Sequence, residues 1–335
     1  MTLTSIGDLA RGLAFRHRTT QIKTQIDTLS QELATGRVAN VAERLRGDYS
    51  QLADIDRNIA RLGTLSVSTF EARLFADAMQ TSLAAFETSL SDLSSGLLSL
   101  DQSDQAPTHE RASDLARTQL DAIMAALNAR AGGRSLFSGT ATDKTPLAPP
   151  ETLLTALKAE LAGATTAAEI QQAAKRWFDD PAGFQVAIYQ GATNALAPMQ
   201  ISESERIELP IKADDHLFRD ALRHAAVAAL AADPSLALAP DQRTALLRDA
   251  GAQLVTSTLE TVALRAQVGG AEARADRAAT THAAARTSLE HARSELIGAD
   301  PYETATRLQN VQFQLESLYS VIVRNANLSL ANFLR

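Results

Sequence analysis

The stretch that decides the fold lies at residues 301–335, PYETATRLQNVQFQLESLYSVIVRNANLSLANFLR. Its apolar residues recur at alternating spacings of three and four, the pattern by which a helix buries a narrow stripe against another helix. Asp300 precedes the stretch and Pro301 opens it, and both residues favour a first helical turn. A lone helix with so thin a stripe is marginal in water, so the sequence predicts a helical partner. The predicted stripe consists of Leu308, Val311, Leu315, Leu318 and Ile322, followed by the apolar end Leu330, Phe333 and Leu334.

A similar stripe lies near the N-terminus. Ile22, Ile26, Leu29 and Leu33 recur at spacings of four, three and four, and Gly36 follows where a helix can end or bend. The two terminal stripes are therefore the candidate assembly interface. The alternative is an ordinary last helix that docks on its own domain.

The remaining sequence is helical on both sides of a mixed segment. Apolar spacings predict helices over most of the first 130 residues, and residues 241–296 contain no proline, so one long helix is expected there. Residues 140–150 are rich in Thr and Pro and predict a loop. Residues 151–178 predict short Ala-rich helices, and residues 184–189 and 207–211 alternate as strands do.

These patterns predict a mainly α protein in the form of an elongated helical hairpin or coiled-coil rod. Its N- and C-terminal helices would be paired, and a small α/β or β-containing domain would be inserted in mid-chain. Residues 1–40 with 299–335 would form a terminal coiled coil, residues 41–140 with 216–298 a helical rod, and residues 141–215 a variable outer domain.

Composition excludes several classes of protein. Of the 335 residues, 45% are hydrophobic but only 4% are aromatic, so alanine supplies much of the apolar content and favours close helix contacts. The net charge is -7, and no basic block indicates nucleic-acid binding. Cysteine is absent, which excludes disulfides, thiolate metal sites and thiol nucleophiles. The sequence contains no run of about 18 apolar residues, so it predicts no membrane-spanning helix. The N-terminus does not resemble a cleaved Sec signal.

Sequence patterns typical of catalytic, metal or cofactor sites are sparse. The six histidines are dispersed, without the spacing of a metalloprotease site, and no phosphate-binding glycine loop occurs. Asp214, Asp215 and His216 could hold a cation, but a solvated turn that caps the next helix is the simpler interpretation. His282 lies on an alanine-rich stripe, and the simplest interpretation is a histidine that is hydrogen-bonded between helices. We therefore expect no enzymatic activity, no cofactor and no metal.

Five short stretches, in this order, resemble the flagellin superfamily, and most of all its flagellar hook–filament junction proteins. They are Leu29-Ser30-Gln31-Glu32-Leu33-Ala34-Thr35-Gly36, Leu136-Phe137-Ser138-Gly139-Thr140, Arg265-Ala266-Gln267-Val268-Gly269-Gly270, Asp300-Pro301-Tyr302-Glu303-Thr304-Ala305 and Ser329-Leu330-Ala331-Asn332-Phe333-Leu334. The acidic, proline-containing turn usual after the family's N-terminal helix is missing from residues 40–48, so the local bend there is expected to differ.

The resemblance implies a structural subunit of the bacterial flagellum that joins the hook to the filament. Its implied partners are copies of itself, the hook-side junction protein, flagellin and an export chaperone. The implied location is the flagellum, reached by flagellar type III export. Two alternatives are a short flagellin, which would be a filament subunit, and more remotely a secreted helical adaptor or binding protein.

Overall fold

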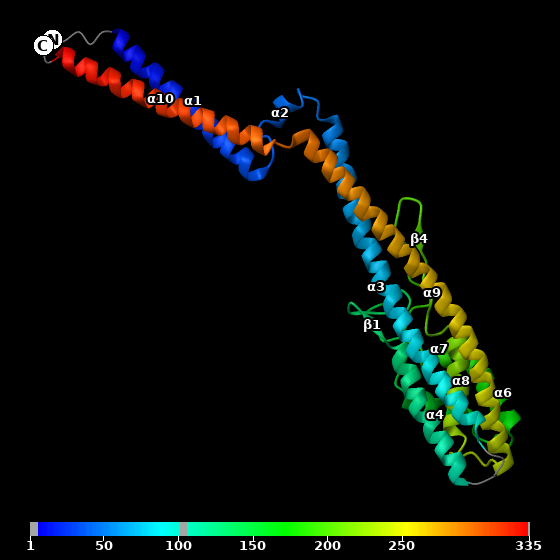
Figure 1. Cartoon of the computed structure of the whole chain (residues 1–335). Coiled ribbons are helices and arrows are strands. Elements are labelled where there is room, and N and C mark those ends of the chain that lie inside the picture. Colours follow the sequence, from blue (N-terminus) through cyan, green and yellow to red (C-terminus); the bar gives the residue numbers. More distant parts are fainter. Residues whose placement is uncertain (1–5, 101–105, 334–335) are drawn as a thin grey trace. The chain divides into compact units, whose positions relative to one another are not determined.

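The computed structural model describes residues 6–100 and 106–333 (Figure 1), with side chains described for residues 10–100 and 107–324. The described residues form a mainly α protein, as the sequence predicts, and they also contain two small two-stranded sheets. The helices are α1 (Ile6–Thr35), α2 (Val41–Arg44), α3 (Ser50–Leu98), α4 (Ala106–Leu127), α5 (Pro150–Glu160), α6 (Ala167–Asp179), α7 (Phe184–Ala187), α8 (His216–Leu230), α9 (Pro240–Ile297) and α10 (Pro301–Phe333). The strands are β1 (Arg130–Ala131), β2 (Arg134–Ser135), β3 (Met199–Gln200) and β4 (Arg206–Ile207).

The chain divides into two compact units. Unit 1 comprises residues 1–63 with 283–335, and unit 2 comprises residues 64–282. Both α3 and α9 contribute residues to each unit. The division into three domains expected from the sequence remains a prediction. None of the helices in the described part of the chain is long and apolar enough to cross a membrane.

Within unit 2, α3 and α9 run antiparallel and are joined by polar contacts. Gln80 Nε2 donates to the carbonyl oxygen of Arg265 (2.6 Å), and the Arg265 guanidinium pairs with Glu87. A side chain at Gly269 would place its Cβ 3.1 Å from Gln80 Nε2. This glycine therefore lets Gln80 approach α9 closely, which gives a packing reason for one of the stretches that resemble the flagellin superfamily.

The centre of unit 2 is α8, whose last ten residues are all buried. It packs against α4 (Figure 1). Its C-terminal carbonyl groups are satisfied from α4, because Ser113 Oγ donates to the oxygen of Ala228 (3.0 Å) and Arg117 Nε to that of Ala229 (3.3 Å). The small side chains in the Ala-rich second half of this helix allow a close approach on several sides.

The Leu136–Thr140 stretch anchors the inserted segment to this core. Phe137 is fully buried, and its ring lies 5.8 Å from that of Phe218 in an edge-to-face contact. Phe218 makes a similar contact with Phe86 of α3 at 5.2 Å. Gly139 has a positive φ of 62°, and a Cβ there would meet the carbonyl oxygen of Asn194 at 2.3 Å. Only glycine fits this backbone approach.

The inserted segment corrects one secondary-structure prediction. Residues 184–189 were expected to be a strand, but Phe184–Ala187 is the short helix α7. Phe184 and Ile188 are buried while Val186 is 76% exposed, which is a helical spacing of four and not an alternation of two. Ile207, Leu209 and Ile211 are buried as expected, but strand β4 ends at Ile207.

The β3–β4 hairpin is held by side chains of α3 and α9. Ser68 Oγ donates to the carbonyl oxygen of Gln200 (2.6 Å), and His282 Nε2 lies 2.7 Å from that of Ile201. A carbonyl only accepts, so His282 carries its proton on Nε2. This is the hydrogen-bonded histidine that its place on the alanine-rich stripe predicts.

The acidic pair before α8 also has local partners. Asp214 pairs with Lys212 Nζ (3.1 Å), and Asp215 accepts from the Lys212 backbone N–H (2.8 Å). Burial raises the pKa of Asp215. Asp215 occupies the N-cap position without a side-chain capping bond, so the predicted capping role is wrong. His216 opens α8 and pairs with Asp220 (3.2 Å).

Candidate assembly interface

The candidate interface is built on the pairing of α1 with α10 in unit 1. The two helices lie side by side (Figure 1). Asp300 caps α10, because its Oδ1 accepts from the backbone N–H groups of Tyr302 (2.8 Å) and Glu303 (3.1 Å). Pro301 then fills the first helical position, where no N–H group is needed. The helix therefore begins where the sequence predicts.

A backbone connection fixes the ends at which the two helices meet. The N–H of Ala299 donates to the oxygen of Gly36 (3.0 Å), and the N–H of Val38 donates to that of Ile297 (3.0 Å). Gly36 has a positive φ of 65°, as a helix-ending glycine often does. Nearby, Arg293 Nε lies 2.7 Å from a carboxylate oxygen of Asp56. The two backbone hydrogen bonds tie the end of α1 to the segment that precedes α10, so the two helices start from a fixed point.

The structure brings the two predicted stripes together. Ile22 is buried, and Ile26 and Leu29 are partly buried, whereas Leu33 is 41% exposed. Leu330 and Phe333 belong to α10, but their side chains lie outside the described residues, as does the whole of Leu334. On α10 the five stripe residues are all partly buried, namely Leu308, Val311, Leu315, Leu318 and Ile322.

Sequence reasoning missed several apolar side chains that are exposed on the face of α10 opposite the stripe. A helix turns about 100° per residue, so Phe313 lies about 200° from both Val311 and Leu315. It is 70% exposed, and Tyr302, three turns earlier on the same side, is 85% exposed. Val321 and Val323 flank this face at 49% and 59%. The signal was present in the sequence, since an aromatic residue opposite a complete stripe is unusual on a solvent-facing helix surface.

One side of this face borders a groove between α1 and α10. The groove has a volume of about 310 Å³ and includes Arg18 and Ile22 from α1 and Phe313, Leu318 and Val321 from α10. Arg18 is the charged residue of its lining. Within the described residues, no group of three or more His, Cys, Asp or Glu side chains could hold a metal ion. The chemistry that this surface offers is apolar burial.

The C-terminal part of the chain is similar to a known protein family. Residues 253–334, which cover about three quarters of α9 and all of α10, match the family model of the bacterial flagellin C-terminal helical region. No curated protein gives a significant match to the chain.

The fold is similar to that of a solved structure from Vibrio parahaemolyticus, of a protein described as flagellar hook-associated. The TM-score is 0.54 at 14% sequence identity, and the similarity covers 75% of this chain and 99% of that chain. The match of residues 253–334 to the flagellin C-terminal helical region confirms the resemblance to the flagellin superfamily in this part of the chain, and the likeness to the solved structure is one of fold.

Proposed function

We propose that this chain is a structural subunit of the bacterial flagellum that joins the hook to the filament. One observation carries the proposal. The paired helices α1 and α10 bury one apolar stripe against each other and leave a second set of apolar side chains exposed on the opposite face of α10. Aromatic side chains such as Phe313 and Tyr302, which are exposed on that side, are enriched at protein–protein interfaces.

Burial of this second face supplies the driving force for assembly. Complete burial of a Phe, Val or Leu side chain contributes roughly 1.5–3 kcal/mol. Phe313 and Tyr302 are among the largest exposed apolar groups on α10, at 70% and 85%. When neighbouring subunits cover these two side chains, their burial contributes a favourable free energy that the isolated chain lacks. The same contact repeated around an axis would add further burial for each subunit.

Three observations favour a junction subunit over a filament subunit. The similarity in fold extends over 99% of the solved hook-associated protein. The Leu136–Thr140 and Ser329–Leu334 stretches resemble junction proteins, and the inserted segment is small. A filament subunit accepts copies of itself without limit, whereas a junction subunit must fit a different protein on one face. The proposed partners are therefore copies of this chain, a hook-side junction protein and flagellin.

Location and export are part of the proposal. A subunit of the axial structure lies in the flagellum outside the cell and would travel there through the flagellar type III export route, with a chaperone covering its terminal helices. The exposed apolar groups of α10 supply a physical reason for such a chaperone, since uncovered apolar surface promotes aggregation. We propose no enzymatic role.

The direct test uses purified protein, isolated hooks and flagellin. We expect the protein alone to form no long filaments, even with ammonium sulfate to strengthen apolar burial. It should add to hook ends and be needed before flagellin can follow. Long homopolymers in negative-stain micrographs would instead identify a short flagellin, the second candidate, which the match of residues 253–334 to flagellin favours. A protein that stays monomeric and never adds to hooks would contradict both.

A further inference from the structure

Large apolar side chains are exposed in two sets on the long helices of unit 2, apart from the terminal helices. Their exposed fractions run from 40% for Val255 to 67% for Leu259. Six of the eight exposed large hydrophobic residues that the structure describes in unit 2 belong to these two sets, so the exposure is concentrated. We call them the α3 stripe, which is Val67, Phe70 and Leu74, and the α9 stripe, which is Val255, Leu259 and Val262.

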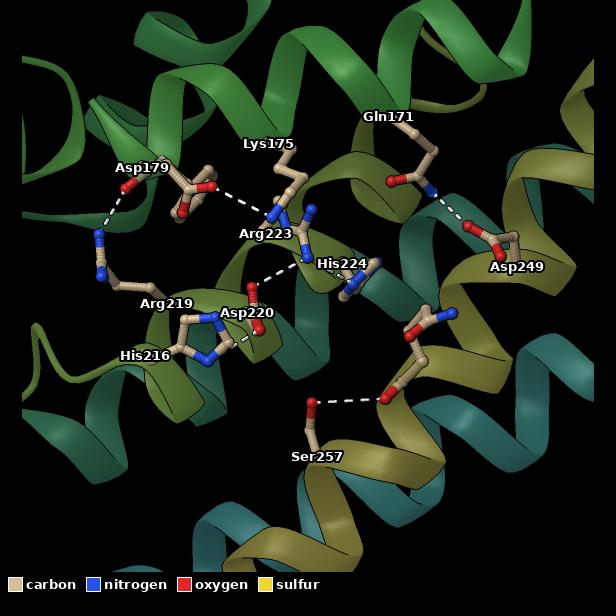
Figure 2. Close-up of polar contacts among 12 residues, drawn as sticks. Gln171, Lys175, Asp179, His216, Arg219, Asp220, Arg223, His224, Asp249 and Ser257 are labelled. Carbon is tan, nitrogen blue, oxygen red and sulfur yellow. Dashed lines mark hydrogen bonds and ion pairs between the residues drawn. The ribbon is translucent and has the colours of Figure 1, made fainter.

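The other sides of α9 are already occupied within the chain. Asp249 accepts from Gln171 Nε2 of α6 (2.9 Å), as Figure 2 shows, and Asp276 pairs with Arg73 of α3 (3.0 Å). The exposed α9 stripe therefore lies on the side of α9 that these neighbours leave uncovered. The α3 stripe likewise lies on the opposite side of α3 from the fully buried Ala72.

The spacings of the two stripes match when the helices run antiparallel. Along the sequence, the α3 stripe has steps of three and four, and the α9 stripe has steps of four and three. Read backwards, the α9 stripe therefore has the same steps as the α3 stripe. Antiparallel pairing sets Phe70 against Leu259, with one further pair on either side, as in the seam of two coiled helices. Because α3 and α9 are antiparallel within the chain, two copies that point the same way present the stripes in this direction.

The two stripes lie too far apart to meet within one chain. Arg73 is paired with Asp276, so Phe70, three residues earlier, lies level with Ala279, three residues later. Leu259 is about 20 residues from Ala279, which corresponds to about 30 Å along the helix. A second copy, displaced by about this distance along the helices, brings the α3 stripe of one copy against the α9 stripe of the other.

The charged residues beside the α3 stripe are compatible with this pairing. In the antiparallel alignment, Glu71 is level with Thr258 and Arg73 is level with Thr256. These two charges therefore meet neutral residues, so the alignment avoids the cost of like charges placed opposite each other.

The size of the contact fits repeated use in an assembly. The exposed parts of the six side chains amount to roughly 500 Å², less than half of the about 1,200 Å² at which stable, specific interfaces begin. One such contact therefore gives no stable free dimer. A copy with neighbours on both sides uses both of its stripes, whereas pairing of a stripe with the same stripe of another copy leaves the other stripe exposed.

We propose that the α3 stripe of one copy of this chain packs antiparallel against the α9 stripe of a second copy, with Phe70 against Leu259 at the centre. The contact is heterologous, so a pair of copies keeps one free α9 stripe and one free α3 stripe to which further copies can add. This inference rests on the proposed function, in which copies of this chain are among the partners. It assigns them a surface in unit 2 that is separate from α1 and α10.

Disulfide cross-linking tests the contact cleanly, because the sequence contains no cysteine. Val67 is level with Val262 in the alignment, so chains with Val67→Cys are mixed with chains with Val262→Cys that carry a longer tag. The mixture is oxidised mildly at about 0.1–1 mM protein, since so small a contact binds in the millimolar range. The mixed dimer should form at least about tenfold faster than either self-dimer, because only that pair brings the two Cα atoms within the ~7 Å that a disulfide needs.

Matched variants make the result specific. Glu260→Cys replaces Val262→Cys in the control, because Glu260 is also exposed but lies about 160° round the helix, and it should cross-link only at the background rate. Leu259→Asp, added to the Val262→Cys chain, should slow the mixed dimer about tenfold by placing a charge in the seam. Gln267→Asp adds the same charge at an exposed position outside the stripe and should leave the rate unchanged. Circular dichroism should show both charged variants folded, since Leu259 is largely exposed.

Three results would overturn the contact. They are self-dimers that form as fast as the mixed dimer, a mixed dimer that forms no faster than the Glu260→Cys control, and an unchanged rate with Leu259→Asp. The flagellar role is tested separately, by addition of the chain to hooks. Mixed dimers from a chain that never adds to hooks would contradict that role and leave the contact standing, and hook addition without mixed dimers would do the reverse.

Discussion

Replacing Phe313 by alanine should separate assembly from the stability of the single chain. Phe313 is 70% exposed, so the isolated chain gains only about a third of the roughly 1.5–3 kcal/mol that its complete burial is worth. About 1–2 kcal/mol is thus left for a neighbouring subunit. Alanine also has the higher helix propensity, which stabilises α10 by roughly 0.5 kcal/mol. The net change within the chain should be close to zero, while each subunit contact weakens by about tenfold.

Two measurements on the same variant test this reasoning. Hydrogen exchange of residues 301–324 should be unchanged in the isolated chain, and the amount of protein bound to hook ends should fall at a given concentration. Phe313→Leu, which keeps most of the apolar surface, is the control and should bind nearly as well as the natural chain. Leu315→Ala should show the opposite balance, since Leu315 is partly buried against α1. Faster hydrogen exchange in Phe313→Ala, together with undiminished hook binding, would refute the proposal that the exposed apolar side chains of α10 contact neighbouring subunits.

Three further predictions concern unit 2, each measured as the free energy of unfolding in urea. The pKa of His224 in the folded chain is about 3, below the ordinary 6.5. Its contribution to the free energy of unfolding is therefore complete above pH 6.5 and is lost as the pH falls toward 3. Between pH 6.5 and 4.5 the chain should lose roughly 2–3 kcal/mol more than the His224→Gln variant; equal losses would contradict the buried neutral ring. Phe86→Ala should cost about 3–5 kcal/mol, against less than about 0.5 kcal/mol for the exposed Val186→Ala. Gly139→Ala should cost several kcal/mol, because its Cβ would lie 2.3 Å from a carbonyl oxygen. Gly133→Ala, with a positive φ but open space, should cost only roughly 1–2 kcal/mol.

Periodicity predicted the long elements well, for a physical reason. Helices α9 and α10 carry apolar residues at helical spacing over many turns, and proline and aspartate mark the start of α10. Such repeated local signals agree with one another, so tertiary packing does not need to overrule them. The pairing of the terminal stripes of α1 and α10 follows from the same signal.

Short elements and surfaces could not be predicted in this way. Phe184 and Ile188 are compatible with both a strand and a helix, and the exposure of Val186 decides between them only in three dimensions. The exposed side of α10 was missed because the stripe alone accounts for the pairing of α10 with α1, and Phe313 lies outside that stripe. The contacts among α6, α8 and α9 could not be predicted for another reason, because these separate helices come together only through tertiary packing.

The most direct test of the proposed role is electron microscopy of flagella from cells that lack this protein. The account predicts hooks of normal length without attached filaments, and flagellin released into the medium. Filaments should return when the natural chain is restored, and return poorly with Phe313→Ala. Full-length filaments on hooks in the deletion strain would contradict the proposal that this chain joins the two.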